Sequence, residues 1–449
     1  MVLNPLTRIF SLLTLGILSL ATPAFSQGLI RDAEIEGILR DFTYPILESA
    51  NLRPEDVGIY IVNDDSLNAF VANGQRIHLH TGLIMAAETP GQLIGVIAHE
   101  TGHIEGGHGV RRIEDIKNAS RPAFLSIGLG ILAIAAGAGD AGAALIASSS
   151  QFAYLNFATH TRVQEASADQ AALRYMAATG RSPAGLLEFF ENFREEQLYS
   201  NAERYRYFQT HPLASDRIEA LRRGAERTGL MDKPDSEEEV YKLQIMKAKL
   251  IGFLSYPQQV AARYPESDTS VPARYARAIS AFRNSFTSTA LEQTESLIAD
   301  EPENPFFHEL LGQIYYESGD IAASIEPNRK ALELAPKEPL LMINLAISLT
   351  AEGGEENWKE AADLLTVATS REPENAFAWY ELSIVREKQG RRAEAQLATA
   401  EQAFHYGDCR RAMNFSVRAE RELDPSSLAH RRASDISKIC AANIEGERR

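Results

Sequence analysis

Hydrophobic and polar positions alternate in several different ways along the first third of the chain. From residue 29 to residue 49 the apolar residues recur at helical spacing, which predicts an amphipathic helix. Three short stretches rich in β-branched and aromatic residues predict strands at 57–62, 68–71 and 76–80. Asn73-Gly74 lies between the last two and favours a tight hairpin. A further helix is predicted after Thr89, which is a natural N-cap.

The second half of the chain repeats a pattern of small residues. They recur at intervals of 34 or 37 residues in two sets that keep one register. The sets are Ala278, Gly312, Ala346 and Ser383, and Ala290, Ser324, Ala361 and Ala395. This period is typical of tetratricopeptide repeats, in which small residues let paired helices interlock. We therefore predict an all-α tetratricopeptide-repeat solenoid whose concave groove binds protein.

Composition and charge narrow the class of protein. The 449 residues exceed one ordinary core, which predicts roughly two to three domains. A net charge of −16 argues against a nucleic-acid partner. Cys409 and Cys440 are the only cysteines, too few for a disulfide scaffold or a four-cysteine zinc site. Any metal must therefore be bound by histidines and carboxylates.

Residues 1–26 have the features of a cleaved signal peptide. Arg8 precedes an uncharged, leucine-rich run, and small residues follow at 24 and 26. The run is shorter than the roughly 20 residues that span a bilayer. We expect export to the periplasm, where a Cys409–Cys440 disulfide is permitted, although the sequence leaves their geometry open.

The helix after Thr89 contains the sequence His99-Glu100-Thr101-Gly102-His103. Histidines four residues apart lie on one face of a helix and can bind one ion. Zinc lowers the pKa of bound water, and the adjacent Glu100 is positioned to take its proton. We predict one Zn²⁺ per chain, with Glu100 as the catalytic base.

A third protein ligand is needed, and Glu165 is the strongest candidate. It shares a helix face with Asp169, and small alanines surround both, so that this helix can pack closely on the first. We expect Asp169 to accept a hydrogen bond from a ligand histidine. An exposed acidic helix face is the alternative.

These motifs resemble the HtpX and CAAX-prenyl-protease family of zinc metallopeptidases over roughly residues 30 to 225. The matching residues, in order, are Asn68-Ala69-Phe70, Thr81-Gly82-Leu83, His99-Glu100-x-x-His103, Glu165-x-x-Ala168-Asp169 and Thr210-His211-Pro212. The resemblance implies an α+β zincin-like domain, a small sheet plus helices, with a gluzincin-like site. His99, His103 and Glu165 would bind zinc. His211 would be a fourth ligand that occupies the water position and restrains activity.

Other candidate residues have competing interpretations. Arg217 pairs with Asp169, steadies the oxyanion of the transition state, or lies on a helix surface. His78 and His80 could bind metal, but we favour an exposed strand face. His108 is off the ligand face and is interpreted as structural. The apolar segment 122–150 predicts a hairpin that covers the site, touches a membrane peripherally, or lies in the core.

The predicted order is a signal peptide at 1–26, a zinc metalloprotease domain at 27–231, a helical linker at 232–270, the repeat array at 271–427 and a tail at 428–449. This combination resembles periplasmic proteases that act in quality control of outer-membrane proteins. It implies an endopeptidase, free in the periplasm or associated with the outer membrane, whose array docks stalled or unfolded outer-membrane proteins or the barrel-assembly machinery. The substrate would extend the edge strand at Asn68, Ala69 and Phe70. The alternative is a non-proteolytic periplasmic chaperone or scaffold that uses the array.

Overall fold

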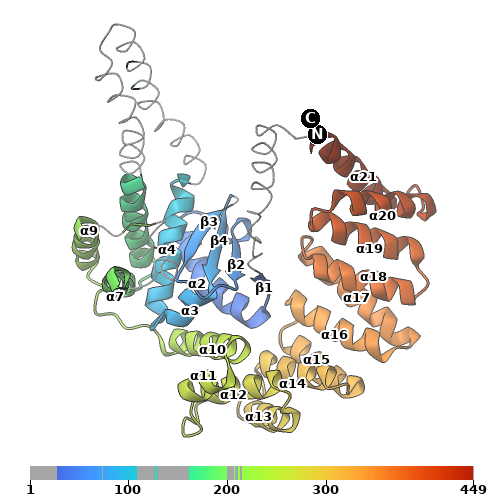
Figure 1. The fold of residues 1–449 in the computed structure, drawn as a ribbon, viewed down its shortest axis with the longest axis horizontal. Coiled ribbons are helices and arrows are strands. Elements are labelled where there is room, and N and C mark those ends of the chain that lie inside the picture. Colours follow the sequence, from blue (N-terminus) through green and yellow to red (C-terminus); the bar gives the residue numbers. More distant parts are fainter. Residues whose placement is uncertain are drawn as a thin grey trace, which may run out of the picture.

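The computed structural model describes residues 28–72, 74–108, 126, 129, 161–199, 207, 211–212 and 215–447. The predicted signal peptide and, apart from two single residues, the segment 122–150 lie outside the described residues. Figure 1 shows a small sheet surrounded by helices, followed by an arc of paired helices that curves beside it. The predicted fold class, a small sheet plus helices followed by an all-α array, is confirmed.

The sheet has the strand order β1-β2-β4-β3. Its strands are β1 (Leu29–Ile30), β2 (Gly58–Val62), β3 (Ala69–Ala72) and β4 (Arg76–His80). β2 and β4 are parallel, whereas β3 pairs antiparallel with β4 and forms one edge. The predicted hairpin is therefore confirmed.

Two local predictions were wrong. The predicted helix at 29–49 begins later, because β1 pairs with β2 and Asp32 caps α2 (Ala33–Ser49) by accepting a hydrogen bond from the Ile35 amide. His80 is buried at 1% exposure, with its Nδ1 2.9 Å from Ser66 Oγ and its ring edge-to-face with Phe70. His78 is half-buried and stacks against Tyr60 and Phe70.

Helices cover the sheet and carry the histidine motif. After α2 come the short helix η1 (Pro54–Asp56), α3 (Thr81–Ala86) and α4 (Pro90–Glu105), then a helix over residues 161–178, α7 (Ala184–Tyr199) and α9 (Ser215–Glu226). Thr89 caps α4 as predicted, because its side chain accepts a hydrogen bond from the Gln92 amide. Most of α4 is buried, and this rigid, central helix positions the histidines.

A close helix crossing fixes α4 against the helix over residues 161–178. A Cβ atom on Gly102 would lie 2.9 Å from the Cα of Ala168 and 3.1 Å from the Cβ of Ala171. Only glycine lets the two backbones approach this closely. Glycine inside a helix costs about 1 kcal/mol relative to alanine, and the close packing of the two helices offsets this cost.

The array begins on the same core as the first domain. α10 (Glu237–Leu254) and α11 (Pro257–Arg263) fill the predicted linker, and α10 packs against α2, α3 and α12. One continuous hydrophobic cluster runs from Ile35 to Ile314. The first repeats are therefore packed onto the sheet domain and are not merely tethered to it.

Paired helices continue to the end of the described chain. They are α12 (Val271–Arg283), α13 (Thr287–Asp300), α14 (Pro305–Glu317), α15 (Ile321–Leu334), α16 (Pro339–Glu352), α17 (Glu355–Arg371), α18 (Ala376–Lys388), α19 (Arg392–His405), α20 (Cys409–Glu422) and α21 (Leu428–Glu447). Most of the predicted small positions are buried at helix contacts, although Ser383 is half-buried. A disulfide joins Cys409 and Cys440, and so links α20 to α21.

A buried charge cluster lies where the array meets the sheet domain. The Lys249 ammonium on α10 is 2.9 Å from Asp32 Oδ2, 3.1 Å from Glu34 Oε2 and 3.6 Å from Glu309 Oε2. Tyr275 donates a hydrogen bond of 2.9 Å to Glu34 Oε2. We call Lys249, Asp32, Glu34, Tyr275 and Glu309 the joint cluster.

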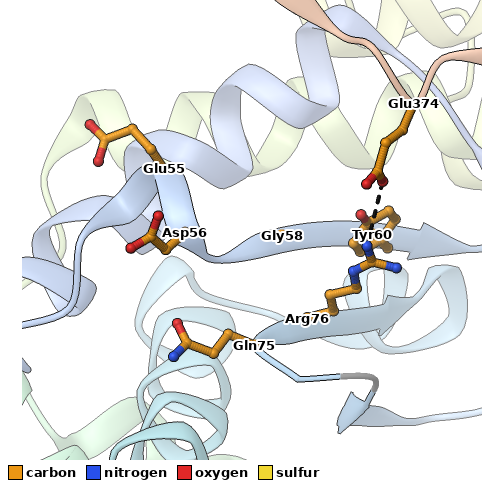
Figure 2. A pocket seen from close by; sticks show the side chains of 7 residues that line it. All are labelled: Glu55, Asp56, Gly58, Tyr60, Gln75, Arg76 and Glu374. Atoms are coloured by element: carbon orange, nitrogen blue, oxygen red, sulfur yellow. Dashed lines mark hydrogen bonds and ion pairs between the residues drawn. The ribbon is translucent and has the colours of Figure 1, made fainter. Parts of the chain in front are cut away.

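The array touches the sheet domain again further along. Ion pairs join Arg40 to Glu338 at 2.8 Å, Arg31 to Glu372 at 2.7 Å and Arg76 to Glu374 at 3.4 Å. Figure 2 shows the last pair at the rim of a cavity of about 550 Å³ beside the start of β2 and β4. None of the residues that line this cavity belongs to the histidine motif. Among the described helices, none combines the length and apolarity needed to cross a membrane.

Candidate metal centre

Helix α4 brings His99 and His103 to one point, as their spacing predicts. Their Nε2 atoms are 3.1 Å apart, and the His99 ring is fully buried. Glu165, on the crossing helix, is 3.3 Å from His99 Nε2 through Oε2 and 3.4 Å from His103 Nε2 through Oε1. The close approach at Gly102 thus brings the acidic helix within reach of both imidazoles.

His211 joins the same cluster from a segment far along the chain. Its Nδ1 atom is 3.3 Å from His99 Nε2 and 3.0 Å from each oxygen of Glu165. One nitrogen or oxygen from each of His99, His103, Glu165 and His211 lies within 4.8 Å of the others. The ring of Tyr207 stacks on that of His211, with centroids 4.6 Å apart.

Asp169 and Arg217 support the cluster from behind. Asp169 Oδ1 is 2.9 Å from His99 Nδ1, the nitrogen that faces away from the other ligand candidates. Arg217 donates to both oxygens of Asp169 at 2.6 and 2.8 Å, and its Nη1 is 3.0 Å from Glu165 Oε2. Arg217 is buried, which excludes the helix-surface interpretation. Burial opposes ionisation of Asp169, but hydrogen bonds from Arg217 and His99 outweigh it and lower its pKa.

Glu100 lies beside the cluster, and its carboxylate is free of hydrogen bonds from the described residues. It is 1% exposed, and neither oxygen accepts a hydrogen bond from the residues that the structure describes. The nearest cation candidate is His211, whose Nε2 is 3.5 Å from Oε1. Burial raises the pKa of Glu100. A carboxylate with a raised pKa exchanges a proton more readily near neutral pH, as a general base must.

The surroundings assign opposite charge states to neighbouring groups. Burial and the nearby His99 hold the pKa of His103 well below its usual value, which keeps a lone pair for a ligand. Burial alone would lower the pKa of His99, but hydrogen bonds to Asp169 and Glu165 raise it to about 9. Burial likewise disfavours the anion of Glu165, yet His211 and His99 lower its pKa far below the ordinary value. A proton and a metal ion therefore compete for His99.

The donor set fits a metal ion. Ring nitrogens of three imidazoles and a carboxylate face one another at 3.0 to 3.4 Å in a buried space. A single cation can take the inward-facing lone pairs of all four groups at once. The Glu100 carboxylate beside them, which accepts no hydrogen bond from the described residues, also fits a site that holds water or substrate.

His108 contacts the cluster in a way that the sequence interpretation missed. Its Nδ1 is 2.9 Å from His103 Nδ1, on the side of the ring that faces away from the other candidates. A helix continued past residue 105 would have pointed His108 elsewhere, but α4 ends there. The Gly106-Gly107 pair was the signal that could have shown the chain turning back.

The edge strand lies next to the His211 segment. Asn68 precedes β3, and its buried Oδ1 accepts no hydrogen bond within the described part of the chain. Ala69 is fully buried, and Phe70 is half-buried against His78. The Tyr207 amide donates to Leu67 O at 3.0 Å, and the His211 amide donates to Tyr207 O at 2.8 Å. The segment that carries His211 is thereby attached beside the edge of the sheet.

Both halves of the chain are similar to known proteins. Peptidase family M48 matches residues 30–225, and the tetratricopeptide repeat matches residues 275–339. The chain is 23% identical over 414 residues to the beta-barrel assembly-enhancing protease of Escherichia coli (strain K12), covering 91% of this chain and 83% of the relative. Its namesake in Yersinia pestis is 22% identical over 410 residues, with 91% and 83% covered. Metalloprotease LoiP of Escherichia coli (strain K12) is 28% identical over 178 residues, 38% of this chain and 63% of the relative.

Proposed function

We propose that this chain is an exported zinc endopeptidase. It is a metalloprotease whose residues 30–225 match peptidase family M48, and it carries tetratricopeptide repeats. Its place would be the periplasm, and its role the assembly and quality control of outer-membrane proteins. The names of the relatives support that role. The observation that carries the catalytic proposal is the buried cluster of three histidines and Glu165 beside Glu100, whose carboxylate accepts no hydrogen bond from the described residues.

Zinc would be held by His99, His103 and Glu165, a donor set of two imidazoles and a carboxylate that is common in catalytic zinc sites. When bound, the ion supplies Lewis acidity, which polarises a carbonyl and lowers the pKa of water. Asp169 holds the His99 ring by its Nδ1 atom, and Arg217 holds Asp169 in turn. These contacts fix the orientation of His99 and hold a proton on its Nδ1, which leaves Nε2 for the ion.

Glu100 is the proposed general base. Its raised pKa and its position beside His99 suit it to take a proton from the attacking water. It would then deliver that proton to the nitrogen of the departing amine. Arg217 contacts Glu165 and Asp169 and is 5.1 Å from the Phe190 ring, so we assign it a supporting role rather than contact with the oxyanion.

His211 is the proposed restraint on activity. Its Nδ1 faces the same point as the three proposed ligands, and its Nε2 faces Glu100. A fourth protein ligand fills the position that water or the substrate carbonyl needs. Peptide cleavage therefore requires the His211 segment to move away.

The substrate is proposed to extend the sheet at β3. An edge strand offers unpaired backbone groups to an extended peptide, and Asn68 adds an unsatisfied buried acceptor at its start. Because the His211 segment is attached at Leu67, a peptide that pairs along this edge would run towards the segment that must move.

The array is proposed to bring clients to the protease. Its concave groove would bind stalled or unfolded outer-membrane proteins or the barrel-assembly machinery. We place the domain boundaries at residues 27–231 and 271–427, with 232–270 between them. A peripheral membrane contact through 122–150 remains part of the proposal, and liposome flotation with and without that segment tests it.

The decisive experiment compares wild type with Glu100→Gln on an unfolded substrate, with the bound metal measured in both. We expect the variant to keep its zinc and lose cleavage by about 10³-fold or more, because the amide cannot take a proton. Equal cleavage by the two proteins would sink the protease mechanism. Full function in cells without cleavage would favour the alternative, a chaperone or scaffold that works through the array.

The restraint by His211 is tested by His211→Ala. We expect faster cleavage of an unfolded substrate by this variant, since the position opposite the three proposed ligands becomes open. Tyr207→Phe is a matched control, because it preserves the ring that stacks on His211. Cleavage by His211→Ala at the wild-type rate or below would contradict the restraint.

A further inference from the structure

The hydrogen bond between His108 and His103 bears on the metal centre from outside the proposed ligand set. His103 turns its Nε2 towards His99 and Glu165, at 3.1 and 3.4 Å. Its Nδ1 points the other way and lies 2.9 Å from His108 Nδ1. The two rings are nearly perpendicular, with an interplanar angle of 76°.

The proton positions follow from the chemistry of imidazole. A neutral imidazole that offers one nitrogen to a metal carries its proton on the other. If His103 offers Nε2, its proton is on Nδ1, and that N–H donates to His108. His108 Nδ1 must then be the acceptor, which puts its own proton on Nε2. One hydrogen bond therefore selects the tautomer of both rings.

The chain is shaped to make this contact. α4 ends at Glu105, and Gly106 and Gly107 follow. Gly107 has a φ of +62°, a left-handed conformation that favours glycine, and it turns the chain back. A Cβ atom on Gly106 would lie 2.3 Å from His108 Nε2, so a side chain there would displace the ring. His108 itself is buried at 7% exposure.

The other proposed histidine ligand on α4 is supported in a parallel way. Asp169 accepts from the outward nitrogen of His99 and is itself held by Arg217. His103 has His108 at the corresponding atom. A carboxylate supports one ring and a neutral imidazole the other, which makes His103 the less electron-rich ligand of the two.

We propose that His108 is a positioning residue that fixes the tautomer and the ring orientation of His103 for metal binding. The inference rests on the metal site proposed above. It assigns the Gly106-Gly107-His108 turn a role in metal affinity, separate from proteolysis and from the restraint by His211.

The test uses the full chain and two variants of similar size. His108→Asn keeps an acceptor oxygen near the position of Nδ1, whereas His108→Leu fills a similar volume without an acceptor. Zinc affinity is measured by competition with a fluorescent chelator, and the visible spectrum of the Co²⁺-loaded protein reports the ligand field. Loss of such supporting contacts typically weakens metal binding by about 10- to 100-fold.

We expect His108→Leu to bind zinc about 10-fold or more weakly and to alter the Co²⁺ spectrum, with His108→Asn within about 3-fold of wild type. His430→Ala, which removes a histidine on α21, is the control and should match wild type. Thermal unfolding of the metal-free proteins checks that both His108 variants fold. If only one of the two variants folds, its zinc affinity and Co²⁺ spectrum are compared with those of wild type, and the same criteria apply.

Two results would overturn the inference. One is wild-type affinity and spectrum in His108→Leu. The other is equally weak binding by His108→Asn and His108→Leu, which would mean that ring packing and not the acceptor matters. Failure of the metal site itself would look different, because wild type would then bind no zinc and His103→Ala would change nothing.

Discussion

The molecule buries two clusters of charged groups, and they are neutralised in opposite ways. In the joint cluster the chain supplies its own cation, Lys249. The Lys249 ammonium lies among three carboxylates, which belong to Asp32 at the cap of α2, Glu34 on α2 and Glu309 on α14. At the metal centre, nitrogens and oxygens of four side chains face one point, and the proposed cation there is a metal ion taken from solution. Arg217, the nearby guanidinium, binds Asp169 behind the ligand candidates.

The comparison separates a cluster that holds elements of the fold together from one that is arranged to bind a metal ion. A cation that belongs to the chain locks elements together, and removing it leaves buried charges without a partner. A cation taken from solution leaves its coordination positions open to exchange with water and substrate. The joint cluster should therefore govern how the array is attached, and the metal centre should govern cleavage. The following predictions test that division through the free energy of unfolding, from the largest effect to the smallest.

Lys249→Met removes the cation of the joint cluster. We expect a loss of about 3–5 kcal/mol, because three buried carboxylates keep no positive partner. The measurement is the urea midpoint of unfolding. Lys242→Met on the same helix is the matched control, since Lys242 makes surface ion pairs with Asp41 and Glu238 and should cost no more than about 1 kcal/mol. Equal losses of unfolding free energy in the two variants would show that the joint cluster contributes no more to stability than a surface ion pair.

Metal removal should act on the other cluster. Zinc at about 100 times its dissociation constant is expected to stabilise the folded chain by about 3 kcal/mol, which a chelator would abolish. Urea unfolding with and without chelator measures the difference. His103→Ala serves as the control and should respond little. A chelator effect of the same size in that variant would place the stabilising metal elsewhere.

The joint cluster should also make stability depend on pH. Burial raises the pKa of Glu309 to about 7, although Lys249 opposes the shift. The folded chain then holds a proton that the unfolded chain releases at its lower pKa, so stability falls as pH rises from about 5 to about 7. Asp32, Glu34 and Asn344 also face this group.

Glu309→Gln removes this titration. We expect the wild type to lose on the order of 2 kcal/mol relative to the variant between pH 5 and 7. Urea unfolding of both proteins across this range measures the relative slope. Parallel curves for the two proteins would show that Glu309 is ionised throughout.

The smallest effect is expected where the array touches the sheet domain at its surface. Arg40 and Glu338 are partly exposed, with side chains at 30% and 25%. A double-mutant cycle with Arg40→Ala and Glu338→Ala should give a coupling of about 0.2–1 kcal/mol that weakens in salt. A coupling energy as large as the loss expected for Lys249→Met would mean that this contact contributes as much as the joint cluster.

Local patterns predicted the elements whose residues act over short distances. His99 and His103 share a face because four residues are close to one helical turn, and Thr89 caps the helix as its type favours. The sequence showed the register of the repeats because a small residue must recur wherever two helices cross. Glu165 was a candidate through its motif, and the alanines around it indicated close helix packing, which Gly102 on α4 allows.

What the sequence did not reveal depends on contacts between distant segments. His80 is buried beside Ser66 and Phe70, and the pattern of its own strand does not show these contacts. His108 reaches His103 through a turn of two glycines, which a continued helical pattern conceals. The burial of Lys249 has no local signal, since its partners lie more than 200 residues upstream or about 60 downstream.

The arc of helices can be regarded as a beam with two supports. It is anchored at α10 by the shared core and propped at Glu338, Glu372 and Glu374 by ion pairs to the sheet domain. Among the described residues, these props end before α18, so that α18, α19, α20 and α21 overhang (Figure 1). The Cys409–Cys440 link stiffens the tip of that overhang. A load applied at the tip would therefore act through a long lever arm, and the props near Glu374 would be the fulcrum about which it turns.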